Sequence, residues 1–481
     1  MEASNRRPNI VLINCDDLGY GDLSCYGSIQ HDTPAIDQMA AEGVRFTDFY
    51  TASPVCSPSR AAMLTGSYPL RIGFGGRRID NAPVLFPGQA HGLHPDEITI
   101  ARLLQDSGYA TRLVGKWHCG DQPEFLPTRH GFDGWFGLPY SNDMGRQVFS
   151  EVEQSYSEIM TALGTPLPDD APMLSERPPL PLMMDDEVIS EQPDQAILTE
   201  RYTNDAVQFL RDHRNQPFFL YLAHMYVHLP IYVQSQFLNK SRNGRYGAAV
   251  HCIDWSTGLI MRELIDLGLD GHTVVVFTSD NGALTREGGG SNGALRASKG
   301  TTWEGGQRVP CIIRWPDRIP GGQVLATVTN AMDLYPTLAT WGGVDVPTDR
   351  TLDGRDLGPL LESGCPPDEQ PFLYILGGNI EAVRLGRWKL HVRKWNSEQI
   401  RLYDLVADVG ERYDLAGDCP DVVGQLLSIV EAARAELGDD ATDIAGSAVR
   451  PVGQVMDPTT LTTYDENTPY FMAEYDLADR G

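Results

Sequence analysis

Four short apolar runs along the chain have the pattern of strands that are buried on both faces of a parallel sheet. They are Asn9–Asn14 (NIVLIN), Leu113–Val114, Phe218–Ala223 (FFLYLA) and Thr273–Thr278 (TVVVFT). Between them lie stretches with helical periodicity, at Pro34–Glu42, Asp96–Ser107, Arg201–Arg211 and Ala248–Leu267. Because strands alternate with helices, we expect an α/β fold with a large mixed, mostly parallel sheet sandwiched by helices.

The pattern changes twice along the chain. Residues 145–194 are rich in proline, which indicates a long surface excursion within a catalytic α/β domain that spans residues 1–359. Residues 360–440 contain short strand-like segments at 373–375, 382–385, 388–392 and 399–403, followed by a helical segment at 421–437. This order predicts a C-terminal subdomain with a four-stranded antiparallel sheet and one helix. Residues 441–481 have no clear period and are predicted to form an extended arm.

Composition and charge narrow the class of protein. The 481 residues include 65 Asp and Glu against 38 Lys and Arg, a net charge of −27. This surplus argues against nucleic acid or an anionic membrane as a partner, since both attract basic surfaces. The eight cysteines are dispersed, without zinc-ligand spacing. No apolar signal segment precedes the first strand, so the sequence as written predicts a cytoplasmic protein, or an exported one whose signal has been removed.

Polar side chains follow each of the four apolar runs at once. Ligands bind beyond the carboxyl ends of strands in open α/β sheets, and parallel strands end at the same edge. We therefore expect the residues that follow the four runs to converge, although they are far apart in the sequence. They are Asp16 and Asp17 after the first run, Lys116 and His118 after the second, His224 and His228 after the third, and Asp280 and Asn281 after the fourth.

Three carboxylates and one amide oxygen in this set indicate a metal site. Crowded carboxylates repel one another unless a cation lies among them. All-oxygen ligation favours a hard ion, which predicts Ca²⁺ or, as the less favoured choice, Mg²⁺. Taken singly, the Asp-Asp and Asp-Asn pairs also suit turns or helix caps. Their common position after apolar runs favours the metal, with Asp16, Asp17, Asp280 and Asn281 as ligands.

The segment CSPSRAAMLTG, from Cys56 to Gly66, is the most specific motif in the chain. Pro58 suits the first turn of a helix, and Gly66 suits its end. Cys56 then lies at the helix N-terminus, where partial positive charge favours anions. From the residues alone, Cys56 is a buried thiol before a helix or a thiolate nucleophile.

This motif resembles the CxPSR signature of the type I, formylglycine-dependent sulfatases. The resemblance includes PNIVLINCDDLGYGDLSCYG, GKWHCG, VHLP, TSDNG, SKGTTWEGGQRVP and LYDLVADVGERYDLA, in the family's order. FLPTRHGFDGWFGLPYSND is most similar to the arylsulfatase A and N-acetylgalactosamine-6-sulfatase branch. The resemblance implies an alkaline-phosphatase-like fold. It also implies a formylglycine-generating enzyme that oxidises Cys56 to formylglycine (3-oxoalanine) during maturation.

The resemblance also implies a role for each site residue in hydrolysing a sulfate monoester. The aldehyde hydrate at residue 56 attacks sulfur, while Ca²⁺ polarises a sulfate oxygen. Asp280 is the candidate base for the attacking hydroxyl, and His118 is the candidate base for the second hydroxyl. His228 is the candidate acid for the leaving oxygen. Arg60 orients the hydrate, while Lys116 and Lys299 pair with sulfate oxygens, and Ser141 matches a sulfate-contacting position.

Two other functions remain open at this point. One is a phosphatase or phosphonate monoester hydrolase on the same scaffold, and the other is an inactive sulfatase-like binding protein. The expected substrate is a sulfated small molecule or saccharide. We expect its alcohol to be selected by three parts of the chain: residues 145–194, the Arg71–His94 loop and the C-terminal subdomain. The oligomeric state is not readable from the sequence.

Overall fold

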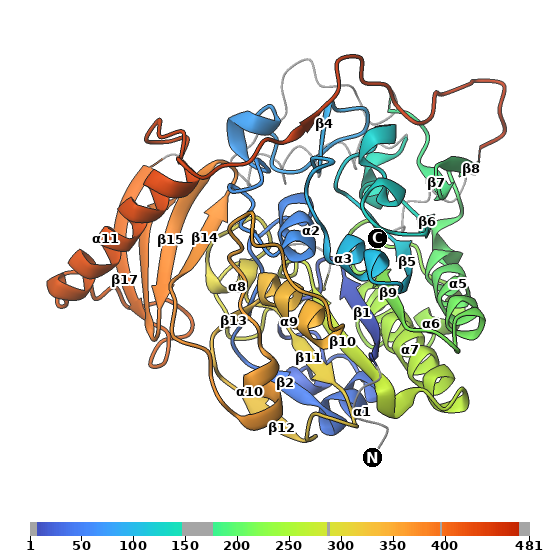
Figure 1. The fold of residues 1–481 in the computed structure, drawn as a ribbon, viewed down its shortest axis with the longest axis horizontal. Coiled ribbons are helices and arrows are strands. Elements are labelled where there is room, and N and C mark those ends of the chain that lie inside the picture. Colours follow the sequence, from blue (N-terminus) through green and yellow to red (C-terminus); the bar gives the residue numbers. More distant parts are fainter. Residues whose placement is uncertain (1–6, 147–176, 286–288, 395–396, 471–481) are drawn as a thin grey trace.

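A computed structural model describes residues 7–146, 177–285, 289–394 and 397–470. Its centre is a ten-stranded sheet (Figure 1). In spatial order the strands are β12 (Gln323–Leu325), β2 (Val44–Phe46), β11 (Cys311–Arg314), β10 (Thr273–Ser279), β1 (Asn9–Cys15), β9 (Phe218–Ala223), β5 (Ala110–Gly115), β6 (Gly134–Gly137), β7 (Pro181–Met184) and β8 (Glu187–Glu191).

The middle of the sheet is parallel. Strands β10, β1, β9, β5 and β6 pair in parallel, so their carboxyl ends share one edge. Successive residues of β1 belong to different cores: Ile10 and Leu12 pack on one face of the sheet, and Val11 and Ile13 on the other. Burial on both faces explains why these strands are continuously apolar rather than alternating.

Helices cover both faces of this sheet. The helices α1 (Pro34–Glu42), α5 (Leu198–Asp212) and α7 (Gly244–Asp266) pack on the face that holds Val11. On the opposite face lie α2 (Cys56–Thr65), α3 (Ile100–Asp106) and α9 (Leu334–Trp341). This is the sandwiched, mostly parallel sheet expected from the sequence, and the expected fold class is confirmed.

Antiparallel strands extend the sheet at both edges. On one side β11 pairs antiparallel with β10 and with β2. On the other side β7 and β8 form a hairpin that pairs antiparallel with β6. This hairpin comes from the 145–194 segment, which we expected to be a surface excursion; residues 147–176 of that segment lie outside the described residues. The prolines of this segment do not prevent two strands from forming, because Pro181 is the first residue of β7, a position where a missing N–H is tolerated.

The C-terminal part forms a second, smaller layer. The strands β14 (Phe372–Leu376), β15 (Asn379–Leu385), β16 (Trp388–Lys394) and β17 (Ser397–Asp404) make a four-stranded antiparallel sheet in sequence order. The helix α11 (Pro420–Leu437) packs on this sheet through Leu426, Val430 and Leu437. The sheet and helix agree with the antiparallel unit expected from the sequence. Figure 1 shows this layer as the orange elements beside the larger sheet.

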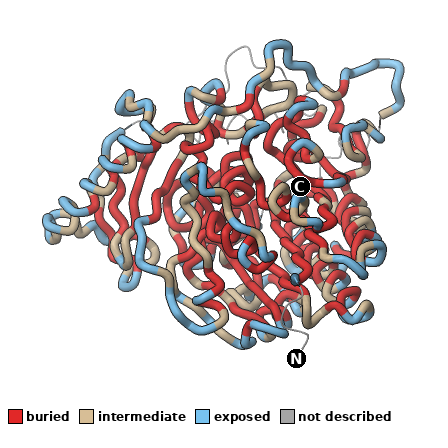
Figure 2. Tube along the Cα trace, in the orientation of Figure 1, coloured by how far each residue is buried: buried red, intermediate tan, exposed pale blue. Residues whose placement is uncertain are grey.

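The remaining elements are short. They include β3 (Phe49–Tyr50), β13 (Thr329–Asn330), α6 (Ser235–Leu238), α8 (Glu304–Gln307) and α10 (Gly358–Ser363). In the C-terminal arm, β18 (Gly453–Gln454) pairs with β4 (His91–Gly92), which fastens residues 441–470 to the larger layer. Figure 2 shows the central strands buried and the arm largely exposed. None of the helices in the described ranges combines the length and apolar character needed to cross a bilayer.

Candidate active site

The polar residues that follow the parallel strands meet at one edge of the sheet. Asp16 and Asp17 follow β1, Lys116 follows β5, and Asp280 follows β10. The Nζ of Lys116 lies 2.6 Å from Oδ2 of Asp16, although 100 residues separate them. The backbone N–H of Asp17 donates to Oδ1 of Asp280 over 3.2 Å. The topology of the sheet therefore builds this cluster from distant segments.

Cys56 begins α2 and faces the same cluster. Its Sγ lies 3.4 Å from Oδ1 of Asp16. The Sγ and carboxylate oxygens of Asp16, Asp17 and Asp280 all lie within 4.8 Å of one another. The helix ends at Gly66, which has a left-handed φ of 63°. Cys56 therefore occupies the positive end of a ten-residue helix, as the motif predicts.

Buried cations balance the carboxylates. Arg60, one turn after Cys56, donates through Nε to Oδ2 of Asp280 over 2.7 Å and through Nη1 to the Lys116 carbonyl over 2.9 Å. Burial opposes ionisation of Asp16, but Lys116 and other cations nearby hold its pKa well below the usual range. Burial raises the pKa of Asp280 to about 6, although Arg60 works against this rise.

The four predicted metal ligands fit a hard divalent cation. Asn281 donates through Nδ2 to Oδ1 of Asp17 over 2.8 Å. Its Oδ1 is buried and accepts no hydrogen bond within the described ranges. That oxygen needs a positive partner, and the three carboxylates beside it supply further oxygen donors. An oxygen-only donor set of this kind is typical of Ca²⁺ or Mg²⁺ sites.

The surroundings of Cys56 oppose its use as an ordinary thiolate. Burial, and after it the negative charge of Asp16, raise the pKa of the Cys56 thiol well above its usual value. A thiolate nucleophile instead requires a lowered pKa. The geometry thus argues against the simplest nucleophilic role for this cysteine. It is compatible with a cysteine whose side chain is altered before it reacts.

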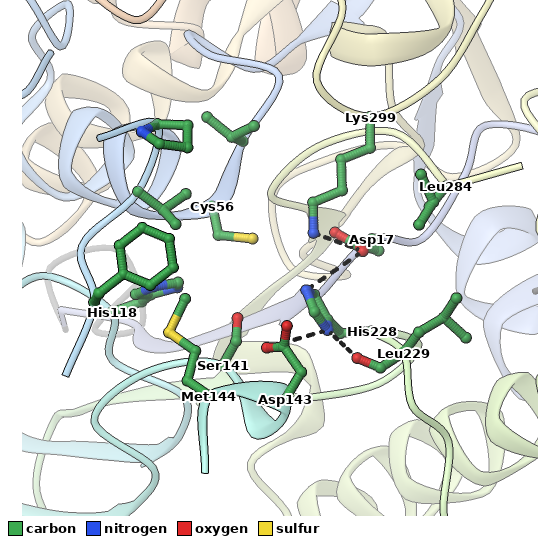
Figure 3. A pocket seen from close by; sticks show the side chains of 14 residues that line it. Asp17, Cys56, His118, Ser141, Asp143, Met144, His228, Leu229, Leu284 and Lys299 are labelled. Atoms are coloured by element: carbon green, nitrogen blue, oxygen red, sulfur yellow. Dashed lines mark hydrogen bonds and ion pairs between the residues drawn. The ribbon is translucent and has the colours of Figure 1, made fainter. Parts of the chain in front are cut away.

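A pocket of about 90 Å³ opens in front of Cys56 (Figure 3). Of the predicted site residues, its lining includes Asp17, Cys56, His118, Ser141, His228 and Lys299. The others, Asp16, Arg60, Lys116, Asp280 and Asn281, lie behind this lining and contact its members or one another. The structure therefore brings together every residue to which the resemblance gives a role at the site, whereas His224 does not line the pocket.

Two lysine side chains of the site are held in place by hydrogen bonds to neighbouring side chains. Lys299 donates through Nζ to Oδ2 of Asp17 over 2.8 Å. Although burial opposes its charge, Asp17 and its neighbours hold the pKa of Lys299 well above the usual value. Lys116 donates to Ser141 Oγ over 2.6 Å in addition to Asp16. Lys299 is thus a charged group at the pocket surface, and Lys116 lies behind Ser141.

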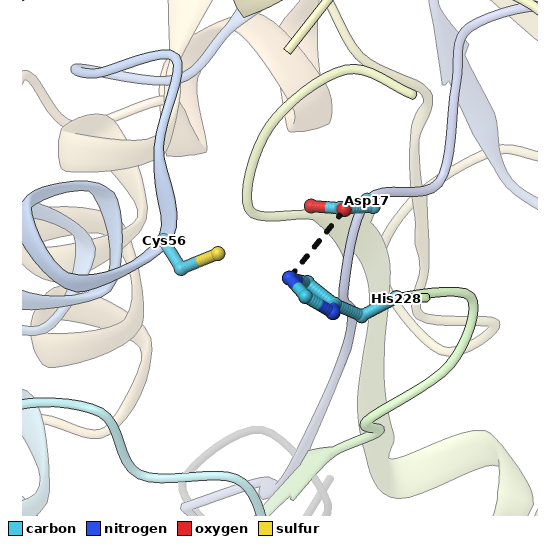
Figure 4. Close-up of side chains that lie close together, drawn as sticks. All are labelled: Asp17, Cys56 and His228. Atoms are coloured by element: carbon cyan, nitrogen blue, oxygen red, sulfur yellow. Dashed lines mark ion pairs between the residues drawn. The ribbon is translucent and has the colours of Figure 1, made fainter. Parts of the chain in front are cut away.

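Each of the two histidines in the pocket has one ring nitrogen fixed by a backbone carbonyl. His118 Nε2 lies 3.0 Å from the Leu85 carbonyl, which can only accept, so Nε2 carries the proton and Nδ1 keeps its lone pair. Burial, with Lys116 as a second cause, lowers the pKa of His118 well below its usual value. His228 donates through Nδ1 to the Leu229 carbonyl over 2.6 Å, while Nε2 lies 3.9 Å from Oδ2 of Asp17. Figure 4 shows the side chains of His228, Asp17 and Cys56 facing one another, with the ion pair between His228 and Asp17 marked.

Some residues near the motifs serve packing instead. His224 is not among the pocket residues; it is fully buried, and burial lowers its pKa to about 3. The buried Trp117 stacks on His130, and Trp303 packs against His391 and Tyr403. Leu85 and Asp143 are two further residues of the site. Leu85 acts through its backbone, and Asp143 lines the pocket from a short turn, so neither has a sequence signal.

Comparison with known proteins supports the resemblance to the sulfatases. The sequence model of the Sulfatase family matches residues 8–344. Human arylsulfatase A is 38% identical over 472 residues, which is 90% of this chain and 89% of that protein. Rat N-acetylgalactosamine-6-sulfatase is 40% identical over 407 residues, covering 81% of this chain and 72% of that protein.

A solved structure shows the same architecture. The PsFucS1 sulfatase from Pseudoalteromonas sp. is 27% identical and superposes with a TM-score of 0.77, covering 89% of this chain and 90% of that one. Family, relatives and fold agree with the motifs and with the convergence of Cys56, the carboxylates and the lysines at one sheet edge. The chain therefore belongs to the sulfatase family and is a sulfuric ester hydrolase of the arylsulfatase-like kind.

Proposed function

We propose that this chain hydrolyses its sulfate monoester with a formylglycine derived from Cys56 and with Ca²⁺ held by Asp16, Asp17, Asp280 and Asn281. One observation carries the proposal: Cys56 Sγ and the oxygens of three carboxylates lie within 4.8 Å of one another. The unsatisfied Oδ1 of Asn281 supports the metal. The raised pKa of the Cys56 thiol supports a chemically altered side chain.

The two groups supply what this site's own side chains lack: bound Ca²⁺ provides a Lewis acid for a sulfate oxygen, and hydrated formylglycine provides a hydroxyl nucleophile. The protein binds and orients the sulfate. Lys299 and Lys116 present ammonium groups to it, and Ser141 Oγ lies 2.6 Å from Lys116 Nζ. Arg60 holds the carboxylate of Asp280 and the end of β5 in place.

Proton transfers fall to three groups. Asp280 is the base for the attacking hydroxyl, because its carboxylate lies beside residue 56. His118 accepts a proton at Nδ1, the ring nitrogen that has no partner among the described residues. His228 acts as the acid in its doubly protonated form: Nδ1–H stays on the Leu229 carbonyl, and Nε2–H passes to the leaving oxygen, which leaves a neutral ring. Such acid–base assistance contributes about 10²–10⁴-fold to a rate.

The direct test uses protein co-expressed with a formylglycine-generating enzyme. Mass spectrometry of the Cys56 peptide should show loss of the thiol, and 4-nitrophenyl sulfate should be hydrolysed. We expect the Cys56→Ala variant to lose more than about 10³-fold in kcat/KM, as removal of a nucleophile does. Cys365→Ala is the control, because Cys365 is exposed.

Two results would contradict the proposal. A large preference for 4-nitrophenyl phosphate over the sulfate would favour the phosphatase alternative. Conversion of Cys56 without any turnover would favour a binding protein.

A further inference from the structure

The pocket in front of Cys56 has two chemically different ends. Its buried end carries the polar residues already described. Its outer end is formed by apolar side chains, which we call the apolar collar: Pro83, Val84, Phe86, Met144, Leu229 and Leu284. Within the collar, Val84, Phe86, Leu229 and Leu284 are partly exposed, whereas Cys56 and His118 are each 1% exposed. This difference places these four residues at the mouth of the pocket, while Pro83 and Met144 are buried and line it further in.

The collar is assembled from several segments and is held in place by hydrogen bonds. Leu85, between Val84 and Phe86, donates through its N–H to Ser57 Oγ over 3.0 Å. Its carbonyl accepts from His118 Nε2 over 3.0 Å. The loop that carries Val84 and Phe86 is therefore tied to α2 and to a residue of the site itself.

The side of the collar formed by Met144 and Leu229 is also held in place by a hydrogen bond. Asn142 precedes Met144 in a short turn and donates through Nδ2 to the Pro230 carbonyl over 2.9 Å. Pro230 follows Leu229 directly. Figure 3 shows Met144, Leu229 and Leu284 around the same pocket as Cys56 and Lys299. The collar is therefore a preformed surface rather than a chance gathering of side chains.

The collar offers little to the hydroxyl groups of a sugar. Among the described lining residues, Asp143 is the one polar side chain to which we assign no role at the sulfate, and it lies beside His228. The cavity of about 90 Å³ is much smaller than the ~300–1,000 Å³ of sites that enclose a whole ligand. The alcohol must therefore lie between the collar side chains once the sulfate is bound. Hydroxyls placed there lose their water without gaining partners.

We infer that this enzyme selects sulfate esters of apolar alcohols, whose first ring or chain packs in the apolar collar, over sulfate esters of polyhydroxylated sugars. The inference rests on the proposed function and adds the chemical class of the leaving alcohol. Val84 and Phe86 belong to the Arg71–His94 loop, which we expected from the sequence to contribute to specificity.

The test compares two alcohols that differ in polarity but not in leaving-group type. Cyclohexylmethyl sulfate and galactose 6-sulfate are both primary alkyl sulfates on a six-membered ring. With protein whose Cys56 is converted, we expect kcat/KM for cyclohexylmethyl sulfate to be higher by roughly 10²-fold, the discrimination that pocket contacts of this kind provide. Where turnover is slow, the inhibition constants of the two esters against 4-nitrophenyl sulfate give the ratio of their binding affinities, which should favour cyclohexylmethyl sulfate in the same direction.

Variants of Phe86 locate the effect in the collar. Phe86→Asn should reduce the ratio between the two substrates by about tenfold or more, whereas Phe86→Leu should keep most of it. Val406→Asn is the matched control, since Val406 is 73% exposed and lies after β17, outside the pocket. It should leave the ratio unchanged.

The possible failures are distinguishable. If galactose 6-sulfate is used as well as or better than cyclohexylmethyl sulfate, or if Phe86→Asn leaves the ratio unchanged, the inference is overturned and the proposed function stands. If the converted protein hydrolyses neither alkyl sulfate nor 4-nitrophenyl sulfate, the proposed function fails, and this inference fails with it.

Discussion

At the scale of single residues, each buried carboxylate of the site is paired with a cationic side chain. Asp16 is held by Lys116, Asp17 by Lys299 and Asp280 by Arg60. Each cation comes from a different segment, so each carboxylate is fixed by the fold rather than by its neighbours in sequence. Asn281 differs from them, because its Oδ1 has no partner within the described ranges.

Removal of that oxygen should weaken metal binding. We expect Asn281→Ala to lower the affinity for Ca²⁺ by about tenfold or more, because loss of an outer partner of a ligand already costs about 10–100-fold. Calorimetric titration with Ca²⁺ measures this directly. Asn239→Ala, at an exposed asparagine, is the control and should bind as the unaltered chain does. An unchanged affinity in Asn281→Ala would show that this side chain is not a ligand.

Lys299 should act mainly on the rate. Its ammonium group is preorganised by Asp17 at the pocket surface. We expect Lys299→Met to reduce kcat/KM for 4-nitrophenyl sulfate by about 10²–10³-fold, the usual effect of losing one preorganised contact to developing charge. Steady-state kinetics, with a melting curve to verify folding, measures the effect. A loss below tenfold in a folded variant would argue against contact with the sulfate.

At the scale of elements, the small sheet holds the segment that carries Lys299. The short helix α8 begins five residues after Lys299, and the Glu304 carboxylate accepts hydrogen bonds from Tyr50, Tyr374 and Lys389. Glu411 accepts from the Glu304 N–H over 2.8 Å. Although burial opposes it, Lys389 and Arg308 hold the pKa of Glu304 well below its usual range. Strands β14 and β16 thus contribute to the placement of the loop that carries Lys299.

Breaking this network should destabilise the protein strongly. Removing one partner of a buried ion pair typically costs about 3–5 kcal/mol, and we expect Glu304→Gln to lower the free energy of unfolding by that amount. Denaturant titration measures it. Glu431→Gln on α11 is the control, because Glu431 pairs with Arg434 at the surface and should change stability by at most ~1 kcal/mol. Equal effects of the two changes would contradict this role for Glu304.

At the scale of the whole molecule, stability depends on groups that folding has taken out of water. Burial lowers the pKa of both His130 and His224 to about 3. In the unfolded chain a histidine titrates near 6.5, so between about pH 6.5 and pH 3 the unfolded state binds more protons. These histidines therefore destabilise the fold as the pH falls through that window. Asp22, whose pKa burial raises to about 7, acts in the opposite direction.

A single substitution measures how much one buried histidine contributes to the pH dependence of the free energy of unfolding. Relative to His224→Leu, the unaltered protein should lose stability by about 1.4 kcal/mol for each pH unit below 6.5. Denaturant titrations of both proteins at pH 7.5, 6 and 5 give the difference. Comparison of the two chains cancels the opposing carboxyl groups, which are common to both. A difference that does not change with pH would contradict a neutral, buried His224.

The sequence alone determined the family of the protein and the class of the fold, and it predicted which residues form the site. Continuous apolar runs such as NIVLIN indicated buried parallel strands, and the polar residues after them marked one sheet edge. The residues from Cys56 to Gly66 identified the family because a short motif with a helix start and stop is a local property of the chain. Local patterns of this kind can be recognised in the sequence because they do not depend on contacts with distant segments.

Only the tertiary structure decided how the site is bounded and supported. Phe86, Met144 and Leu284 look like ordinary apolar residues until folding gathers them around one opening. Glu304 and Lys389 pair across 85 residues, and β7 and β8 join the sheet from a segment whose prolines indicated a surface excursion. These features depend on contacts between distant segments, and no local pattern of polarity or spacing encodes which segments meet.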